Sequence, residues 1–304
     1  MKPTEWIWRD GALVKWSDAT VHVSAHALHY GSSVFEGIRA YATKQGVQIF
    51  RLRDHIVRLV DSARVYGMPL AFDVEAIERA CKDVVRANKL PHAYVRPLVF
   101  RGSGPLTLDP TSSPVETVVL AWEWGHYLSA PDTAIDVKIS SWRRVAMGTL
   151  PALAKAGGNY LSSQLIRLEA KREGYVDGIA LSTDGGLSEA SGANLFLVRN
   201  GVVHTPDVGS SILLGITRDT MICLLRDMGI EVREGRLPRE LLHMADEAFL
   251  TGTAAEITGI RSVDRIQVGD GKVGPITRAL QKAFYGLFDG STQDRRGWLD
   301  PVGA

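Results

Sequence analysis

Two short hairpin turns, one in each half of the chain, restrict the fold most strongly. Asp10-Gly11 stands between apolar-rich runs at 6–9 and 12–14, and Asn200-Gly201 stands between similar runs at 194–198 and 202–204. Both dipeptides readily adopt the positive φ angles that a two-residue turn between antiparallel strands requires. The sequence therefore predicts antiparallel sheet in both halves of the chain.

Helical patterns alternate with strand-like runs in the first half. A helix is expected to start with Asp54 as its capping residue and to end at Gly67, and a second helix is expected to end at Asn88. Strand-like runs follow at 93–100 and 117–124. These elements predict a small α+β domain over residues 1–128, followed by a linker at 129–134.

The second half shows the same mixture of elements. Strands are predicted at 136–140, 177–182 and 247–251, and helices are predicted at 160–172, after Gly215 and at 276–288. No internal repeat and no low-complexity segment interrupts this pattern. Residues 135–304 are therefore predicted to form a second, larger domain.

The composition argues against several classes of partner. Of the 304 residues, 45% are hydrophobic and 23% charged, as in ordinary globular proteins, and 35 basic residues nearly balance 34 acidic ones. Without a basic block, we expect neither nucleic acid nor a membrane surface as a partner. No apolar stretch reaches the roughly 18 residues of a membrane-spanning helix. Cys81 and Cys223 form no C-x-x-C pair, so we expect a reducing, cytoplasmic location.

Three residues in the second half suit the chemistry of pyridoxal phosphate. Lys155 and Tyr160 are the ends of the segment Lys-Ala-Gly-Gly-Asn-Tyr, and Glu189 lies in Ser-Glu-Ala-Ser-Gly. A lysine amine condenses with the cofactor aldehyde, a carboxylate keeps the pyridine nitrogen protonated, and a phenol tunes the ring oxygen. Each residue alone also has a plainer interpretation, as a surface lysine, a helix-start tyrosine or a loop glutamate. The hypothesis is that all three contact one cofactor.

Two glycine-containing segments and one arginine are candidates for binding the cofactor phosphate. Gly215-Ile216-Thr217 is expected at a helix start, where N–H groups and the helix dipole favour an anion. At 252–255, Gly-Thr-Ala-Ala allows backbone N–H groups to approach an anion closely. Arg58 is a candidate for a bidentate clamp. The plainer interpretations are ordinary helix capping and a salt-bridged arginine on a helix surface.

No metal site is predicted. His22, His26 and His29 have spacings that would place three imidazoles on one side of a helix, a pattern that zinc ligands can show. The residues that follow, 30–37, are rich in glycine, and no cysteine, well-placed carboxylate or H-E-x-x-H motif completes a ligand set. We therefore expect three structural histidines in a loop. The segment 102–104 likewise lacks the Gly-Lys-Ser/Thr of a P-loop.

Seven motifs follow one another in a fixed order along nearly the whole chain. They are His26-Ala-Leu-His-Tyr-Gly-Ser-Ser-Val-Phe-Glu-Gly-Ile-Arg-Ala-Tyr41, His55-Ile-Val-Arg58-Leu, Tyr94-Val-Arg96-Pro97, Lys155-Ala-Gly-Gly-Asn-Tyr160, Ser188-Glu189-Ala-Ser-Gly-Ala-Asn-Leu-Phe196, Gly215-Ile-Thr-Arg-Asp219 and Gly252-Thr-Ala-Ala-Glu256. Together they closely resemble the branched-chain amino-acid aminotransferases, which belong to the fold-type IV class of pyridoxal-phosphate enzymes.

The resemblance implies a two-domain α+β fold of the D-amino-acid aminotransferase type. Its small N-terminal α+β domain would be joined to a larger C-terminal domain built on a pseudo-barrel sheet with helices outside. The resemblance also implies pyridoxal 5′-phosphate as the cofactor, no metal, and a homodimer at minimum, commonly assembled into a homohexamer.

Roles for individual residues come from the same resemblance. Lys155 would be the catalytic residue, which bonds covalently to the cofactor and later moves the proton between the substrate Cα and the cofactor C4′. Glu189 would pair with the pyridinium nitrogen, and Tyr160 would hydrogen-bond the ring hydroxyl oxygen. The other implied cofactor contacts are Arg58, Ile216, Thr217 and Thr253 at the phosphate and Leu213 on the ring.

The implied substrate site must accept an aliphatic side chain in one half-reaction and the γ-carboxylate of glutamate in the other. Tyr94 and the Thr253–Ala254 backbone would bind the α-carboxylate, with Arg39 nearby. Arg96 would bind the γ-carboxylate. The implied apolar wall consists of Phe35, Trp124 and Tyr127. Two further positions, Tyr30 and Leu108, match residues that the neighbouring subunit supplies.

The sequence thus predicts transamination of leucine, isoleucine and valine with 2-oxoglutarate, giving branched 2-oxo acids and glutamate by a ping-pong mechanism. One alternative is a broadened or D-specific transaminase that acts on D-amino acids or primary amines. A second alternative is a catalytically inactive homologue that binds metabolites. Three residues depart from the family pattern and bear on packing near the cofactor and on substrate breadth: Val145, Ala193 and Leu214. Relatives usually carry a glutamate at the second position and a proline at the third.

Overall fold

The computed structural model describes residues 2–125, 128, 130 and 132–303, which form two compact units. The first unit comprises Met1–Gly125, Ala154–Gly158 and Phe288–Ala304, and the second comprises His126–Leu153 and Asn159–Leu287. Two segments from the second half of the chain thus belong to the first unit. The division into 1–128 and 135–304 stays a prediction, and part of the linker expected at 129–134 lies outside the described residues.

The first unit contains an antiparallel sheet. Its described strands are β1 (Trp6–Arg9), β2 (Ala12–Lys15), β3 (Ser33–Phe35), β4 (Ile38–Thr43), β5 (Gly46–Phe50), β6 (Ala93–Arg101), β7 (Val115–Glu123) and β17 (Leu299–Pro301). They pair in the order β17-β5-β4-β6-β7-β1-β2, with β3 beside β6. Asp10 (φ 43°) and Gly11 (φ 102°) form the turn between β1 and β2. The first predicted hairpin is therefore confirmed.

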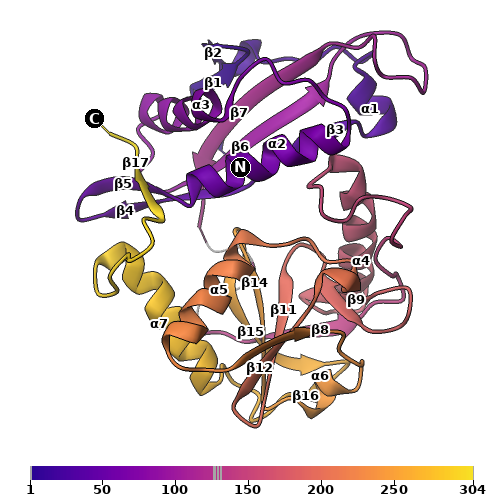
Figure 1. Cartoon of the computed structure of the whole chain (residues 1–304), viewed down its shortest axis with the longest axis vertical. Coiled ribbons are helices and arrows are strands. Elements are labelled where there is room, and N and C mark those ends of the chain that lie inside the picture. Colours follow the sequence, from indigo (N-terminus) through magenta and orange to yellow (C-terminus); the bar gives the residue numbers. More distant parts are fainter. Residues whose placement is uncertain (1, 126–127, 129, 131, 304) are drawn as a thin grey trace. The chain divides into compact units, whose positions relative to one another are not determined.

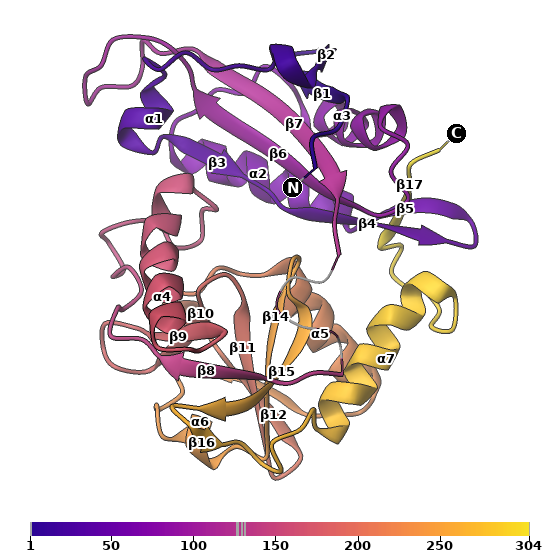
Figure 2. The same cartoon turned by 180° about the vertical axis from the view of Figure 1, so that it is seen from behind.

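Helices cover one face of this sheet. The helices of the first unit are α1 (His26–Tyr30), α2 (Leu52–Val65) and α3 (Val74–Ala87). Figure 1 shows α2 in front of β6, and Figure 2 shows β6 in front of α2. Leu59 of α2 and Val84 of α3 are buried in one core with Val95 of β6 and Ala121 of β7. Because side chains alternate along a strand, the neighbours of Val95 and Ala121 point to the opposite face.

The predicted cap of α2 is wrong. Asp54 lies within the first turn, where it accepts a hydrogen bond from Arg51 Nε at 2.5 Å. Arg51 N donates to Trp298 O at 2.6 Å, and Arg51 has a left-handed φ of 52°. This contact with a distant segment fixes the chain at residue 51, and the helix begins directly after it. The second predicted helix is confirmed, and Asp73 Oδ1 caps it by accepting from Ala76 N at 2.8 Å.

The three histidines near the N-terminus have separate environments, and two of them lie in a helix rather than in the expected loop. His26 and His29 belong to α1, whereas His22 precedes it. The buried His26 ring has Ser32 Oγ 2.7 Å from Nδ1 and Thr107 O 2.9 Å from Nε2. Each ring is held by its own neighbours, since His22 contacts Ser24 and His29 contacts Val23. Within the described ranges, no three metal-ligating side chains form a cluster.

The second unit contains a sheet in which six strands close into a ring. Its described strands are β8 (Ile135–Ile139), β9 (Asp177–Leu181), β10 (Leu187–Ala190), β11 (Asn194–Arg199), β12 (Val202–Pro206), β13 (Val232–Gly235), β14 (Glu247–Gly252), β15 (Glu256–Val263) and β16 (Ile266–Gln267). The order is β10-β9-β8-β15-β14-β11-β12-β13, and an additional β10–β11 pairing closes the ring. This barrel-like sheet confirms the pseudo-barrel expectation. Asn200 (φ 51°) and Gly201 (φ 76°) form the predicted second hairpin turn.

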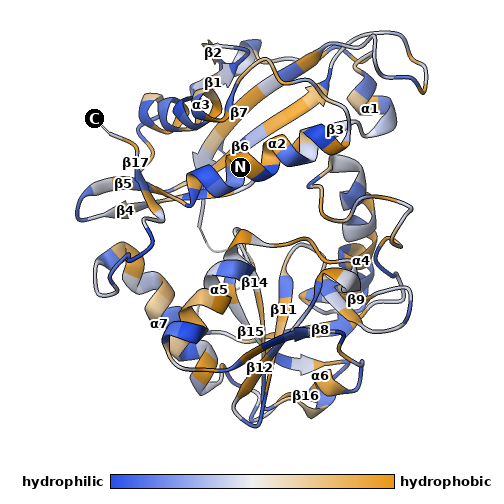
Figure 3. Ribbon diagram, viewed as in Figure 1, coloured by the Kyte–Doolittle hydropathy of each residue, from blue (hydrophilic) through white to orange (hydrophobic). Residues whose placement is uncertain are grey.

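The core of the second unit lies inside this ring and against its helices. The helices are α4 (Tyr160–Arg172), α5 (Ile216–Asp227), α6 (Leu241–Met244) and α7 (Pro275–Asp289), the last of which ends in the first unit. Strands such as β11 and β14 contain apolar stretches (Figure 3), and the buried rings of Phe196 and Phe249 stack with centroids 5.0 Å apart. None of the helices described here is long and apolar enough to span a membrane.

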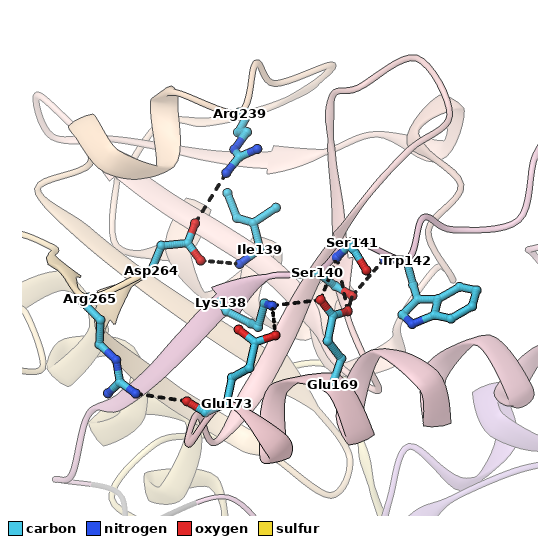
Figure 4. Close-up of polar contacts among 10 residues, drawn as sticks. All are labelled: Lys138, Ile139, Ser140, Ser141, Trp142, Glu169, Glu173, Arg239, Asp264 and Arg265. Carbon is cyan, nitrogen blue, oxygen red and sulfur yellow. Dashed lines mark hydrogen bonds and ion pairs between the residues drawn. The ribbon is translucent and has the colours of Figure 1, made fainter.

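A buried ion pair fixes α4 on β8 (Figure 4). Lys138 Nζ lies 2.8 Å from Glu169 Oε1 and 2.7 Å from Glu173 Oε1. Glu169 also accepts hydrogen bonds from Ser140 Oγ and Ser141 N. Burial raises the pKa of Glu169, but Lys138 and these donors outweigh burial and lower the pKa to about 2. The network therefore holds the residues that follow β8 against α4.

Candidate active site

Lys155 lies in a short segment that packs on β3 of the first unit. Phe35 N donates to Lys155 O at 3.0 Å, and Lys155 N donates to Ser62 Oγ of α2 at 3.0 Å. A bridge also pairs Val34 with Ala156. The Lys155 amine lies 5.0 Å from the centroid of the Phe35 ring. Hydrogen bonds of its own N–H and C=O groups thus hold the backbone of Lys155 in place.

Arg58 of α2 is held by a buried carboxylate. Its Nε and Nη2 atoms lie 2.6 Å from Glu36 Oε1 and 2.9 Å from Glu36 Oε2, a paired side-on geometry. Glu36 is fully buried and also accepts a hydrogen bond from Gly37 N at 3.2 Å. Because Glu36 occupies the side-on edge of the guanidinium, a phosphate would meet the end-on edge formed by the two Nη atoms.

His55 completes this polar cluster. Its Nδ1 atom lies 2.7 Å from Glu36 Oε2. Burial would raise the pKa of Glu36, but Arg58 and His55 outweigh burial and hold that pKa well below its usual range. Burial lowers the pKa of His55, and Arg58 and Lys155 act in the same direction against the opposing effect of Glu36. A neutral His55 therefore donates to an ionised Glu36, whose charge balances that of Arg58.

The sheet face opposite the helices carries aromatic and basic side chains. The register places Arg39 of β4 beside Tyr94 of β6, and Tyr94 beside Trp122 of β7. Arg96 lies two residues further along β6 and therefore points to the same face. Its Cζ atom is 4.5 Å from the Phe35 ring centroid and 5.3 Å from the Tyr94 centroid. The predicted substrate residues on these strands are thus brought together.

Trp124 extends this aromatic group. Its ring centroid lies 5.0 Å from that of Tyr94 and 6.0 Å from that of Trp122. Gly37 leaves room for the group, since a Cβ at this position would lie 1.8 Å from Tyr94 Oη. Arg96 Nε is buried and has no hydrogen-bond partner in the described part of the chain. A buried donor without a partner suits a place where a substrate carboxylate binds.

The residues predicted to act on a neighbouring subunit are exposed. Leu108 is 87% exposed and Tyr30 is 44% exposed. Tyr30 Oη donates to Leu106 O at 3.2 Å, so the tyrosine and the loop that carries Leu108 lie together. Tyr127, which was predicted in the apolar wall, lies outside the described residues.

Glu189 of β10 is buried in the second unit with both of its carboxylate oxygens bound. Oε1 lies 2.8 Å from Arg144 Nη2. Oε2 accepts hydrogen bonds from Asn194 Nδ2 at 2.9 Å and from Leu213 N at 3.1 Å. Three donors from separate segments therefore hold the carboxylate in one orientation.

Arg144 contacts two further elements of this unit. Its Nη1 atom lies 3.4 Å from Ser163 Oγ in α4, and its Nε atom lies 3.5 Å from Ser211 O in the loop before α5. Tyr160 is the first residue of α4. The buried guanidinium thus connects Glu189 with the helix that begins at Tyr160 and with the loop that leads to α5.

The start of α5 has the geometry that the sequence predicts for binding an anion. Gly215 precedes the helix and provides no side-chain cap, while Ile216 and Thr217 begin it and are buried. A Cβ on Gly215 would lie 2.0 Å from Asn194 Oδ1, so only glycine fits here without displacement. Asn194 Nδ2 also donates to Leu213 O at 2.9 Å. The positive end of the helix dipole therefore lies beside the segment that contacts Glu189.

Thr253 and Ala254 lie in the turn between β14 and β15. A Cβ on the preceding Gly252 would lie 3.3 Å from Gly192 O, in the loop after Glu189. This close approach brings the Thr253 turn beside the Glu189 loop. Ala193, one of the three departures from the family pattern, also lies at this contact. Its Cβ is 3.6 Å from the position of a Cβ added to Gly252.

Each unit therefore collects its own set of predicted residues. The set in the first unit is Phe35, Arg39, Arg58, Tyr94, Arg96, Trp124 and Lys155. The set in the second unit is Tyr160, Glu189, Leu213, Ile216, Thr217, Thr253 and Ala254.

Three residues at these sites were missed by the sequence analysis. Glu36 and Asn194 stand inside motifs that carried the resemblance, and they could have been singled out there as polar residues without a role. Arg144 stands outside every motif, next to another arginine. No local pattern marks it, because its pairing with Glu189 depends on how β8 and β10 are placed in the sheet.

These residues fit pyridoxal phosphate. In the first unit, the positioned amine of Lys155 suits the aldehyde of that cofactor. In the second unit, a carboxylate held by three donors suits its ring nitrogen, and a helix start preceded by glycine suits its phosphate. The close approach of Gly215 to Asn194 further shows that the start of α5 packs against a residue that holds Glu189.

Comparison with known proteins agrees with this assignment. The family described as Amino-transferase class IV matches residues 33–263. The branched-chain-amino-acid aminotransferase of Salmonella typhimurium is 52% identical over 304 residues, 99% of this chain and 98% of the relative. The corresponding Pseudomonas aeruginosa protein is 43% identical over 294 residues, 96% of this chain and 95% of the relative.

Solved structures agree over the full length. The crystal structure of the Escherichia coli branched-chain amino acid aminotransferase has a TM-score of 0.97 at 51% identity and covers 99% of this chain and 100% of that one. A second branched-chain amino acid aminotransferase, complexed with N-(5′-phosphopyridoxyl)-L-glutamate, has a TM-score of 0.95 at 41% identity, with 100% of both chains covered. The resemblance drawn from the motifs, the fold class and the cofactor are thereby confirmed. The chain belongs to the class IV aminotransferases, in the group of branched-chain-amino-acid aminotransferases.

Proposed function

We propose that this chain transfers the amino group of leucine, isoleucine or valine to 2-oxoglutarate, with pyridoxal 5′-phosphate as cofactor. The observation that carries the proposal is the Phe35 ring, which has Lys155 Nζ 5.0 Å and Arg96 Cζ 4.5 Å from its centroid. An apolar ring beside the reacting amine suits an aliphatic side chain, and the adjacent arginine suits the γ-carboxylate of glutamate. The same residues can thus serve both half-reactions.

Lys155, Glu189 and Tyr160 have distinct roles in this proposal. Bound pyridoxal phosphate supplies an electron sink for the substrate Cα. Lys155 would hold the cofactor covalently and would move the proton between the substrate Cα and the cofactor C4′. Glu189 accepts a hydrogen bond from the protonated ring nitrogen, which keeps the ring able to take up electrons. Tyr160 donates to the ring hydroxyl oxygen.

The remaining residues bind and orient. The phosphate is bound by Arg58, Thr253 and the helix start at Ile216 and Thr217, while Leu213 packs on the ring. Tyr94 and the Thr253–Ala254 turn bind the α-carboxylate, with Arg39 nearby. The apolar wall is formed by Phe35, Trp124 and Tyr127.

A substrate panel tests the proposal directly. The purified chain is supplied with pyridoxal phosphate, and glutamate formation from 2-oxoglutarate is followed with each enantiomer of leucine, isoleucine and valine and with a primary amine. We expect turnover with the L-amino acids. Turnover with D-leucine alone would overturn the substrate assignment, and turnover with the amine in addition to L-leucine would indicate a broadened enzyme.

Substitution of the lysine separates an enzyme from an inactive metabolite-binding homologue. Lys155→Ala should abolish turnover, whereas Lys171→Ala, at an exposed position near the end of α4, should leave turnover unchanged. The wild-type chain should also gain visible absorbance when pyridoxal phosphate is added. A wild-type chain that stays colourless and inactive would be the inactive homologue.

The active form is, in this proposal, a homodimer at minimum. Leu161, Leu165 and Leu168 of α4 are 63%, 40% and 54% exposed, and their spacing places them along one helix face. An exposed apolar stripe of this kind is typical of a surface that packs against a partner. Tyr30 and Leu108, also exposed, would complete the partner's substrate site.

Complementation between two inactive variants tests this arrangement. Lys155→Ala and Leu108→Asp chains, each weakly active or inactive alone, are mixed under conditions that exchange subunits. One site of the mixed dimer then combines an intact Lys155 with an intact Leu108, and activity should return to part of the wild-type level. Failure to complement, with mixed dimers present, would refute the sharing of residues. Light scattering after size exclusion distinguishes a dimer from a homohexamer.

A cytoplasmic location is also part of the proposal. Cys81 is a buried free thiol, which fits a reducing compartment. Fractionation of the source cells, with the enzyme activity as the marker, tests it.

A further inference from the structure

Arg144 has the kind of contacts expected of a residue that serves the active site rather than the fold alone. Its side chain is 6% exposed, and it pairs with a Glu189 side chain that is 8% exposed. Burying a guanidinium is costly unless its charge and its donors are matched by the surroundings. Arg144 meets this condition with one carboxylate, one hydroxyl and one carbonyl.

The three partners of Arg144 belong to three of the segments of the second unit that the proposed function needs. Glu189 would face the ring nitrogen, Ser163 belongs to the helix that starts at Tyr160, and Ser211 O belongs to the loop that leads to Leu213. A second buried ion pair of this unit, Lys138 with Glu169, joins β8 and the two residues after it to α4 (Figure 4). Arg144 therefore differs from a purely structural ion pair, because its contacts reach three separate segments.

Asn194 supports the same carboxylate from the opposite side. Its Nδ2 atom donates to Glu189 Oε2 at 2.9 Å and to Leu213 O at 2.9 Å. Leu213 N in turn donates to Glu189 Oε2 at 3.1 Å. Asn194 and Arg144 thus bind different oxygens, so rotation of the carboxylate would break contacts with both.

We propose that Arg144 is a positioning residue, which holds Glu189 ionised and oriented toward the cofactor ring nitrogen, with Asn194 as its second support. The proposal rests on the proposed role of Glu189. A guanidinium stays charged at any physiological pH, so it stabilises the ionised carboxylate permanently. The proton shared between Glu189 and the ring nitrogen then stays on the nitrogen, where it is needed for the ring to accept electrons.

Binding of two cofactor analogues to cofactor-free protein tests this inference. The probes are pyridoxal 5′-phosphate and its 1-deaza analogue, in which a CH group replaces the ring nitrogen. The variants are Arg144→Gln and Arg144→Lys, with Lys138→Gln as a matched control that breaks a buried ion pair of the same unit. Dissociation constants are measured by absorbance, and stability is measured by urea unfolding.

We expect Arg144→Gln to weaken binding of pyridoxal phosphate by about tenfold to a hundredfold, the range for a hydrogen bond to a charged group. Binding of the deaza analogue should change by less than about threefold, because the analogue offers Glu189 no N–H. Arg144→Lys should fall between the wild type and Arg144→Gln, since it keeps the charge and loses the planar geometry. Lys138→Gln should lower stability and leave the ratio of the two dissociation constants unchanged.

Equal losses for both probes, or no loss for either, would overturn the inference and leave Arg144 as a structural residue. If Arg144→Gln does not fold, the ratio of the two dissociation constants measured for Arg144→Lys tests the inference by the same criterion. A wild-type chain that binds both probes equally would instead refute the proposed role of Glu189, on which the inference rests.

Discussion

Two buried arginine–glutamate pairs, one in each unit, have similar contact distances, and we propose opposite roles for them. Arg58 Nε lies 2.6 Å from Glu36 Oε1 in the first unit, and Arg144 Nη2 lies 2.8 Å from Glu189 Oε1 in the second. In the first pair the arginine is proposed to meet the cofactor phosphate and the glutamate supports it. In the second pair the glutamate is proposed to meet the ring nitrogen and the arginine supports it. The charge that faces the cofactor is set by the cofactor group it meets, and the buried partner keeps that charge ionised.

The arginine and the glutamate of such a pair differ in what happens to each when the other is removed. A buried carboxylate left alone can take up a proton and become neutral, whereas a guanidinium stays protonated throughout the physiological pH range. Loss of the arginine from the first pair should therefore have a cost that depends on pH. Loss of the glutamate from the second pair should have a cost that does not.

The largest effect is expected for Glu189→Gln. Turnover should fall by about a hundredfold to a thousandfold, as for removal of one charged group from a preorganised site. The free energy of unfolding should fall by about 3 kcal/mol at both pH 6 and pH 8, since Arg144 is left buried and charged. Urea unfolding of the cofactor-free protein measures this, with the exposed Glu240→Gln as control. A loss of unfolding free energy that varies strongly with pH would contradict the expected difference between a buried guanidinium and a buried carboxylate.

Arg58→Gln should destabilise the protein by about 3 kcal/mol at pH 8 and by less at pH 5. Without Arg58, burial raises the proton affinity of the Glu36–His55 pair, whose groups are 0% and 2% exposed. A raised folded-state pKa gives stability that is present at low pH and lost as pH rises through it. Unfolding free energies at pH 5, 6, 7 and 8 test this, relative to wild type. A constant difference over that range would show that the pair takes up no proton.

Glu169 provides a carboxylate that is ion-paired but lies outside both proposed sets of cofactor residues. Its pKa is lowered to about 2 from about 4.5, so its stabilisation is present above pH 4.5 and is lost as pH falls toward 2. The loss should be on the order of 3 kcal/mol in the wild type and absent in Glu169→Gln. Acid unfolding curves measure it. Affinity for pyridoxal phosphate should be the same in the wild type and in Glu169→Gln at pH 7. A change in that affinity would mean that Glu169, like Glu189, affects cofactor binding.

The smallest effect is expected for Glu116→Gln. Arg9 Nη2 lies 2.6 Å from Glu116 Oε2, as close as in the Arg58 pair, but the two side chains are 28% and 18% exposed. At this level of exposure, water can solvate Arg9 when the charge of Glu116 is removed. The free energy of unfolding should therefore fall by less than about 1 kcal/mol. Urea unfolding at low salt checks it. A loss as large as that of Arg58→Gln would mean that distance, rather than burial, sets the cost.

Local chemistry accounts for most of the fold that the sequence predicted. The turns at Asp10-Gly11 and Asn200-Gly201 depend only on positive φ angles, and the helix from Tyr160 to Arg172 depends only on periodicity and end signals. The start of α2 was wrong for the opposite reason. Arg51 is fixed by a hydrogen bond to Trp298, far along the chain, and this contact overrides the capping preference of Asp54.

The sequence by itself determined which groups can react and bind, because Lys155, Tyr160, Glu189 and Arg58 are specified by residue type and motif. Only the tertiary structure decided which groups support them. Glu36 reaches Arg58 by the packing of α2 on β3, and Arg144 reaches Glu189 by the placement of strands in the ring. Reactivity is a property of a side chain and its near neighbours in sequence. The burial and pairing that keep a charge in place arise from residues far apart in the chain, which come together only when the sheets form.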